Sequence, residues 1–229
     1  GQEPYSSGKL ERYIQTCGHT VKRGLQLLNY ALISTLWDKQ INGDVDVKKE
    51  SDEQLRKFFR SSTETNLYDE FKLTQSLLGI FSSKNLDIPI VESKILQRDP
   101  QIRKVIEEAC LSLQELLKKH CQELAPEDCL SAENNVTKIL EHLSFFAAYR
   151  MISLKDIHYS QQRNEKAGLY LHNYTYLAGE NSDTSINKIR VRREDSPILS
   201  FAVLLFKDNF RQNINLDPFI IDYNGLALN

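Results

Sequence analysis

The segment AGLYLHNYTYLAG, residues 167–179, decides the fold class because its side chains alternate in character. One side of the segment carries Leu169, Leu171, Thr175 and Leu177, and the other carries Tyr170, His172, Tyr174 and Tyr176. A period of two residues is typical of a β-strand, in which successive side chains point to opposite faces. The segment therefore predicts a strand in a part of the chain where no helical spacing is found.

Four other stretches around this segment also have the character of strands. These are MISLKDIHYS at 151–160, INKIRVRRE at 186–194, SPILSFAVLLF at 196–206 and NINLDPFIIDYNG at 213–225. The third is almost continuously apolar, as expected of a strand buried on both faces. Together the five stretches predict a small antiparallel sheet or barrel over residues 151–229.

Residues 1–150 instead repeat apolar residues every three or four positions, which predicts helices with an apolar face. In the first helix this apolar stripe consists of Tyr13, Ile14, Cys17, Val21, Leu25, Leu28, Leu32 and Leu36. The expected helices span 10–40, 53–59, 66–81, 101–124 and 132–151. Asp99 followed by Pro100 is a strong helix start, and Ser131 with Asn134 and Asn135 suggests another. The predicted class is therefore α+β, with a helical bundle-like region at 1–150 and an antiparallel β region at 151–229.

The last stretch contains Pro218, which cannot donate a hydrogen bond to a neighbouring strand. We therefore expect an edge strand, a bulged strand or two short pieces. Because an edge can pair with a further strand, either another part of the domain covers it or the protein continues past Asn229, and we favour continuation. If the edge is an interaction surface, a partner strand would pair with it around Phe219, Ile220 and Ile221.

Composition limits the classes of function. The 229 residues are 41% hydrophobic and 26% charged, and the net charge of −2 gives no overall attraction to nucleic acid or membrane. No apolar run is long enough for a membrane span. Four cysteines in a chain of this length favour reduced thiols and a cytoplasmic location.

The sequence predicts no cofactor and no metal site. Cys110 and Cys121 are spaced to share a helix face, with His120 and Cys129 nearby, but the chain has no CxxC pair. It also lacks the glycine-rich phosphate loops and the nucleophile elbow of common enzyme families.

Tyrosines and arginines on adjacent predicted strands suggest one alternative, the binding of single-stranded nucleic acid. Bases stack on aromatic rings and phosphates meet cations in such sites. The candidate residues are Tyr170, His172, Tyr174, Tyr176, Arg190 and Arg192.

This alternative makes a prediction of its own. Replacing both Arg190 and Arg192 with alanine should weaken oligonucleotide binding and flatten its dependence on salt, because fewer counterions are then released. A titration at several salt concentrations measures both effects. Binding that does not vary with salt would contradict the hypothesis.

A second alternative is an enzyme with a site at the junction of the two regions, around His142, His158 or His172. Catalytic groups that are distant in sequence can meet in space, so the absence of a local motif leaves this open. A histidine paired with an acid in a deep pocket would favour it.

The succession YRMISLKDIHYS, LYLHNYTYLAG, FAVLLF and INLDPFIIDYNG, within residues 149–225, resembles uncharacterised accessory domains of multidomain bacterial signalling and defence proteins. In those domains a helical segment precedes strands and a closing L-x-P-F strand. The resemblance implies a regulatory or interaction module, with a protein partner or further domains of the same chain as its target. It assigns no active-site residue.

Overall fold

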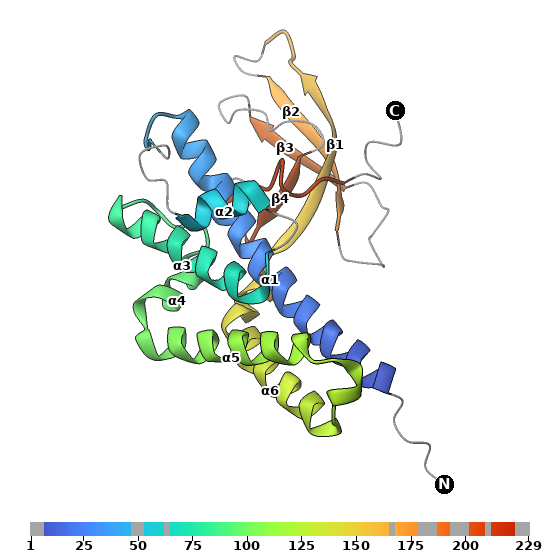
Figure 1. Ribbon diagram of the computed structural model, residues 1–229. Helices are drawn as coiled ribbons and strands as arrows, with labels where there is room; N and C mark the ends of the chain where they lie inside the picture. Colours follow the sequence, from blue (N-terminus) through green and yellow to red (C-terminus); the bar gives the residue numbers. More distant parts are fainter. Residues whose placement is uncertain are drawn as a thin grey trace. The chain divides into compact units, whose positions relative to one another are not determined.

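The computed structural model describes residues 7–46, 53–61, 65–164, 168–177, 187–192, 202–208 and 212–222. The chain divides into two compact units, residues 1–145 and 146–229. The first unit holds the helices and the second holds the sheet (Figure 1). The predicted α+β class is confirmed.

The first unit consists of long helices that are joined by short helices and turns. Their bounds are α1 Ser7–Ile41, α2 Glu53–Ser61, α3 Leu67–Ser83, α4 Ile95–Arg98, α5 Pro100–Lys118 and α6 Pro126–Leu143. Short 3₁₀ turns lie at η1 Val91–Lys94 and η2 Cys121–Glu123, and η3 covers Ser144–Ala148. The sequence did not predict η1 or α4, which follow the break at Pro89.

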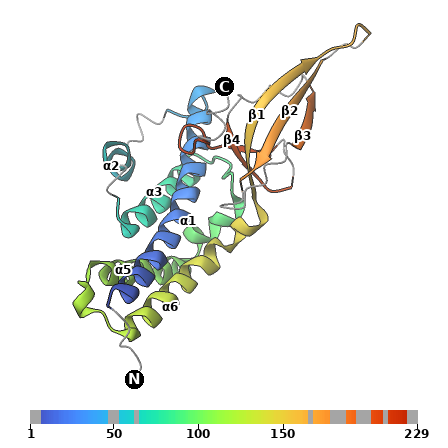
Figure 2. The ribbon, with the colours of Figure 1, turned by 90° about the vertical axis from the view of Figure 1, so that its right-hand side faces the viewer.

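Helix α1 is the longest helix and forms the centre of this unit (Figure 2). Its apolar stripe is buried as predicted, at Val21, Leu25, Leu28, Leu32 and Leu36. The glycines of α1 let neighbouring helices approach closely. A Cβ on Gly18 would lie 2.6 Å from Leu117 Cδ1 of α5, and one on Gly24 would lie 3.1 Å from Leu143 Cδ1 of α6.

One predicted helix start is confirmed and another is wrong. The Asp99 side chain accepts hydrogen bonds from the backbone N–H groups of Gln101 and Ile102, which caps α5. Helix α6, however, begins at Pro126, so Ser131 lies inside it. Pro126 occupies the first turn, where no intrahelical N–H is required, and this outweighs the polar residues further along.

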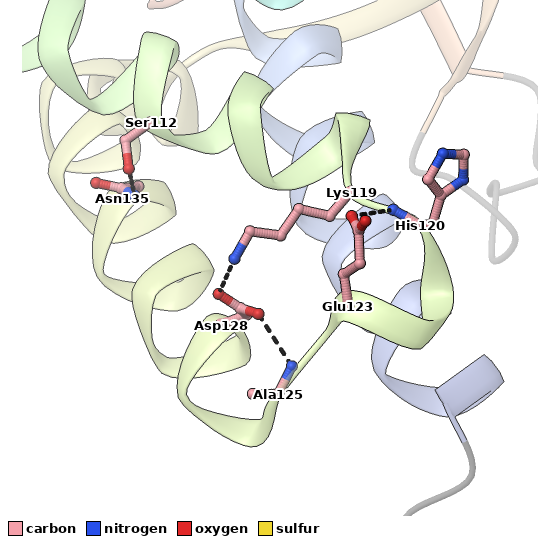
Figure 3. A network of polar contacts seen from close by, with 7 residues as sticks. All are labelled: Ser112, Lys119, His120, Glu123, Ala125, Asp128 and Asn135. Carbon is pink, nitrogen blue, oxygen red and sulfur yellow. Dashed lines mark hydrogen bonds and ion pairs between the residues drawn. The ribbon is translucent and has the colours of Figure 1, made fainter.

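Polar contacts connect the end of α5 to the start of α6 (Figure 3). Asp128 Oδ2 accepts from the backbone N–H of Ala125 at 3.0 Å, and its other oxygen pairs with Lys119 Nζ at 2.8 Å. These bonds lower the pKa of Asp128, with the Lys119 hydrogen bond as the largest cause. Because α5 stops at Lys118, Cys121 is not on the same helix as Cys110, and the predicted shared face is wrong.

A buried polar network joins α1 to α3. Glu70 is 1% exposed, and its carboxylate accepts from Thr65 Oγ1 at 2.6 Å, Asn29 Nδ2 at 2.9 Å and Gln26 Nε2 at 3.1 Å. Thr74 Oγ1 in turn donates to Asn29 Oδ1 at 2.7 Å. These three donors are neutral side chains. They supply the hydrogen bonds that the buried carboxylate needs without a buried positive charge.

The second unit is a five-stranded antiparallel sheet in the order β3-β2-β1-β4-β5. The strands are β1 Arg150–Ser160, β2 Leu169–Tyr176, β3 Asn187–Arg192, β4 Val203–Phe206 and β5 Ile214–Asn215. All four residues of β4 are buried, as its apolar run predicted. Strand β5 lies at the edge of the sheet and ends before Pro218, so the terminal run is a very short edge strand followed by a turn.

Candidate functional site

The predicted tyrosine stripe exists, but it lies against the core of the sheet unit. Tyr170, Tyr174 and Tyr176 pack on a cluster of buried residues from the two adjoining segments, namely Ile152, Leu154, Ala202, Leu204 and Phe206. Burial raises the pKa of Tyr174 to about 12, and a hydrogen bond with Tyr176 adds to the shift. Ring faces in contact with a core are less accessible for stacking on bases.

The outer end of the stripe is more open. Tyr159 of β1 is 51% exposed, and its ring centroid lies 5.3 Å from that of Tyr170. Its hydroxyl donates to Gln161 Oε1 at 2.5 Å. This pair is the most accessible aromatic surface that the described strands offer.

The strand register separates the tyrosines from the predicted arginine positions. Tyr170 stands opposite Val191, whereas positions 190 and 192 of β3 stand opposite Leu171 and Leu169. Opposite residues of an antiparallel pair share a face, so both positions are in register with the leucine side of β2. The side chains of Arg190 and Arg192 lie outside the described part of the structure, and nucleic-acid binding stays a prediction.

The three histidines proposed for catalysis occupy different environments. His172 is completely buried in β2, His142 is half-buried near the end of α6, and His158 of β1 is exposed. His158 Nε2 lies 2.7 Å from Asp156 Oδ1, which also accepts from Asn173 Nδ2 at 2.6 Å. An acid–histidine pair is therefore present, but it lies on an exposed part of β1.

His172 predicts a pH dependence for the stability of the sheet unit. Burial lowers the pKa of this imidazole below its ordinary value of 6.5, so the unfolded chain takes up a proton more readily than the folded one. Stability should be full above about pH 6.5 and should fall as the pH drops toward the lowered folded pKa.

Urea unfolding followed through the NMR signals of β1 and β2 residues measures this effect. We expect His172→Phe to flatten the pH dependence of these signals and to leave that of the helical unit unchanged. An equal loss of stability at low pH in the wild type and the variant would contradict the assignment.

The terminal segment that was predicted to bind a partner is tied to the sheet. Asp222 pairs with Lys155 Nζ at 2.5 Å, and both side chains are largely buried. Phe219 is half-buried and Ile221 is 43% exposed. Lys155 lies at the irregularity between Leu154 and Asp156, where β1 shifts register against β2.

An open apolar groove lies in the helical unit, where the sequence predicted only packing. Its volume is about 530 Å³. It is formed by the first turns of α1 and α6, with the lining residues Lys9, Leu10, Tyr13, Pro126, Cys129, Leu130 and Glu133. Cavities of 300–1,000 Å³ with apolar walls and a few polar groups are the usual size of binding sites.

Two side chains of the groove are unusually exposed for their type. Leu130 is 63% exposed and Tyr13 is 43% exposed, although Tyr13 was predicted to belong to the buried stripe of α1. The prediction for Tyr13 is wrong because this side chain faces the open groove beside α6, whereas its neighbour Ile14, which is 1% exposed, takes the buried side of the same turn. Periodicity cannot reveal this, since it gives the apolar face of a helix but not what covers each turn.

The chemistry of the groove is that of a binding surface. Burial is the main cause that raises the pKa of the Cys129 thiol, followed by the charge of Asp128, so the cysteine is a neutral wall residue. Glu133 raises the pKa of Tyr13 by its negative charge, which is the largest cause, and by a hydrogen bond. The groove thus combines apolar walls with one carboxylate beside a tyrosine hydroxyl.

Comparison with protein-family models, curated proteins and solved structures found no match. Within the described ranges, no helix is both long and apolar enough to cross a membrane. Among the same residues, no cluster of three or more histidine, cysteine or acidic side chains could hold a metal ion.

Proposed function

We propose that this chain is a non-catalytic interaction module of a cytoplasmic protein, and that the groove between α1 and α6 receives a side chain of a protein partner. The observation that carries the proposal is the exposure of Leu130 and Tyr13 around a cavity of about 530 Å³. Large apolar side chains that stay exposed around a concavity favour an interaction site over isolated surface residues. The partner is another protein or a further domain of the same chain.

Several features of the groove suit a small anchor. Hot spots at interfaces are often single large side chains inserted in a pocket, surrounded by contacts that exclude water. Leu10 and Leu130 supply aliphatic walls from two helices, and Tyr13 combines a large ring with a polar hydroxyl. Both walls belong to regular helices, so the groove keeps its shape before a partner binds.

The substitution Leu130→Asp tests the proposal. Because the side chain is mostly exposed, we expect the free energy of unfolding to change by less than about 0.5 kcal/mol. Placing a charge in the apolar anchor site should lower the affinity for a partner at least tenfold, since about 2 kcal/mol is typical of an interface hot spot.

A photo-crosslinking residue at Tyr13 in source cells provides the assay, with one at the exposed Lys104 of α5 as the control position. We expect a defined crosslinked product from position 13 that excess unlabelled wild-type chain displaces and Leu130→Asp chain does not. Equal displacement by both chains would show that the groove is not the interaction site.

A further inference from the structure

We infer that the outer edge of β3 binds an extended segment of a partner protein in which acidic and apolar residues alternate. This surface lies in the sheet unit and is independent of the groove between α1 and α6. The inference follows from the place of β3 in the sheet and from the residues that its register sets opposite one another.

Strand β3 is the longer of the two outer strands of the sheet. All six of its residues pair with β2, and in the part of the chain that the structure describes no strand pairs with its other side. Alternate residues of an outer strand direct their backbone N–H and C=O groups away from the sheet, so these groups can bond to an added strand. Strand β5, the other outer strand, has two residues and is followed by a turn, so it offers much less backbone.

One set of alternate positions in β3 is cationic. Its members are Lys188, Arg190 and Arg192. The residues that stand opposite them in β2 are uncharged, namely Asn173, Leu171 and Leu169. The neighbouring strand therefore places no acidic residue at these register positions. An added strand could do so from the other side, and opposite charges directly across a strand pair stabilise the pairing.

The other positions of β3 favour apolar residues in the partner. Ile189 and Val191 stand opposite His172 and Tyr170 of β2. Opposite residues share a face of the sheet, and Tyr170 packs on the core cluster of the sheet unit. Because successive residues of a strand belong to opposite faces, an added strand matches both faces only if its apolar and acidic residues alternate.

A second copy of this chain does not suit the same edge. If two β3 strands paired with matching faces, cations would stand opposite cations, which destabilises a strand pair. A shift by one residue would instead set the cationic face of one strand beside the apolar face of the other. Charged residues on outer strands are a common protection against self-association. The charge pattern thus disfavours self-pairing and leaves the edge available to an acidic strand.

Three capped peptides test the inference: SVEVEVES, SVKVKVKS and the block peptide SVVVEEES. Each is titrated into the ¹⁵N-labelled full chain, and the backbone amides of residues 187–192 report binding. We expect SVEVEVES to bind about tenfold more tightly than SVVVEEES, because only alternation places every acid opposite a cation, and SVKVKVKS to bind more weakly than both. Hydrogen exchange should slow at alternate amides of β3 when SVEVEVES is bound, because alternate N–H groups bond to the added strand.

Two double variants identify the responsible charges. Arg190→Glu with Arg192→Glu should reverse the order of affinity, so that SVKVKVKS binds more tightly than SVEVEVES. Arg103→Glu with Lys104→Glu, at exposed positions of α5, changes the net charge equally and should preserve the preference for SVEVEVES. The peptide comparison in the wild-type chain does not depend on the folding of either variant.

The outcomes distinguish strand addition from simple attraction between charges. Equal affinity of SVEVEVES and SVVVEEES, or no slowing of exchange at alternate β3 amides, would overturn the inference. Tighter binding of an oligothymidylate than of SVEVEVES at the same amides would assign the cations to nucleic acid instead. If no peptide shifts these amides, the edge is not a docking site. None of these results affects the proposed groove, because its test uses Leu130 and Tyr13 in the other unit.

Discussion

Glu70→Gln should destabilise the helical unit by about 2–4 kcal/mol, although it changes only one oxygen to an amide nitrogen. The carboxylate of Glu70 accepts from Gln26 and Thr65 through one oxygen and from Asn29 through the other. A glutamine would place an N–H₂ group against one of these donors. At least one buried donor then loses its acceptor, which costs more than losing an exposed hydrogen bond.

Removing the charge of Glu70 should by itself stabilise the folded protein, because burying a charge is unfavourable. The network nevertheless favours the carboxylate, because three donors converge on it and Asn29 Oδ1 is already used by Thr74. Rotating Asn29 to offer its oxygen would leave Thr74 facing a donor. Flipping Gln26 would in turn direct its N–H₂ group at Arg23 Nη1, from which Gln26 Oε1 now accepts a hydrogen bond at 3.2 Å. Each amide flip therefore breaks another hydrogen bond of the network.

Urea denaturation followed by circular dichroism at 222 nm measures the effect, because this signal reports helix. Glu108→Gln is the matched control: its side chain is 66% exposed and pairs with Lys104 along α5, so the change should stay within about 0.5 kcal/mol. Equal or higher stability of Glu70→Gln would mean that the desolvation of the charge outweighs its hydrogen bonds.

The second large effect is expected at Phe81 of α3. This side chain is completely buried, and it is the largest of the fully buried side chains in the described part of the chain. Phe81→Ala should lower the free energy of unfolding of the helical unit by about 3–5 kcal/mol, through lost apolar burial and the cavity left behind.

Phe59→Ala is the control for this substitution, because the same atoms are removed from a side chain that is 57% exposed. We expect a loss below about 1 kcal/mol there, limited to the ring contact with Phe58 at 5.3 Å. Calorimetry or urea denaturation of both variants measures the difference. Similar losses in the two variants would contradict the assignment of Phe81 to the core.

The proposed binding groove differs from these stability predictions in what its test measures. Leu130 is exposed on α6, so its substitution tests binding with little effect on folding. Glu70 and Phe81 are buried, so their substitution tests folding. Comparing Leu130→Asp with the two buried variants therefore separates a loss of partner binding from a loss of structure.

The sequence by itself determined the class of the long helices and of the strands. The three-four spacing of Val21, Leu25, Leu28 and Leu32 and the period of two at residues 169–176 are local patterns, which depend only on the geometry of one helix or strand. The cap at Asp99 is local for the same reason, because its partners lie two and three residues away.

Only the tertiary structure decided which apolar residues remain exposed. Tyr13 fits the apolar spacing of α1 but borders the groove that α1 forms with α6, whereas Ile14 beside it is buried. Tyr174 belongs to the polar side of the alternating pattern in β2, but its ring packs on Ile152 and Leu154 of another strand. Burial of a side chain depends on elements distant in sequence, so neither position could be assigned from its own segment.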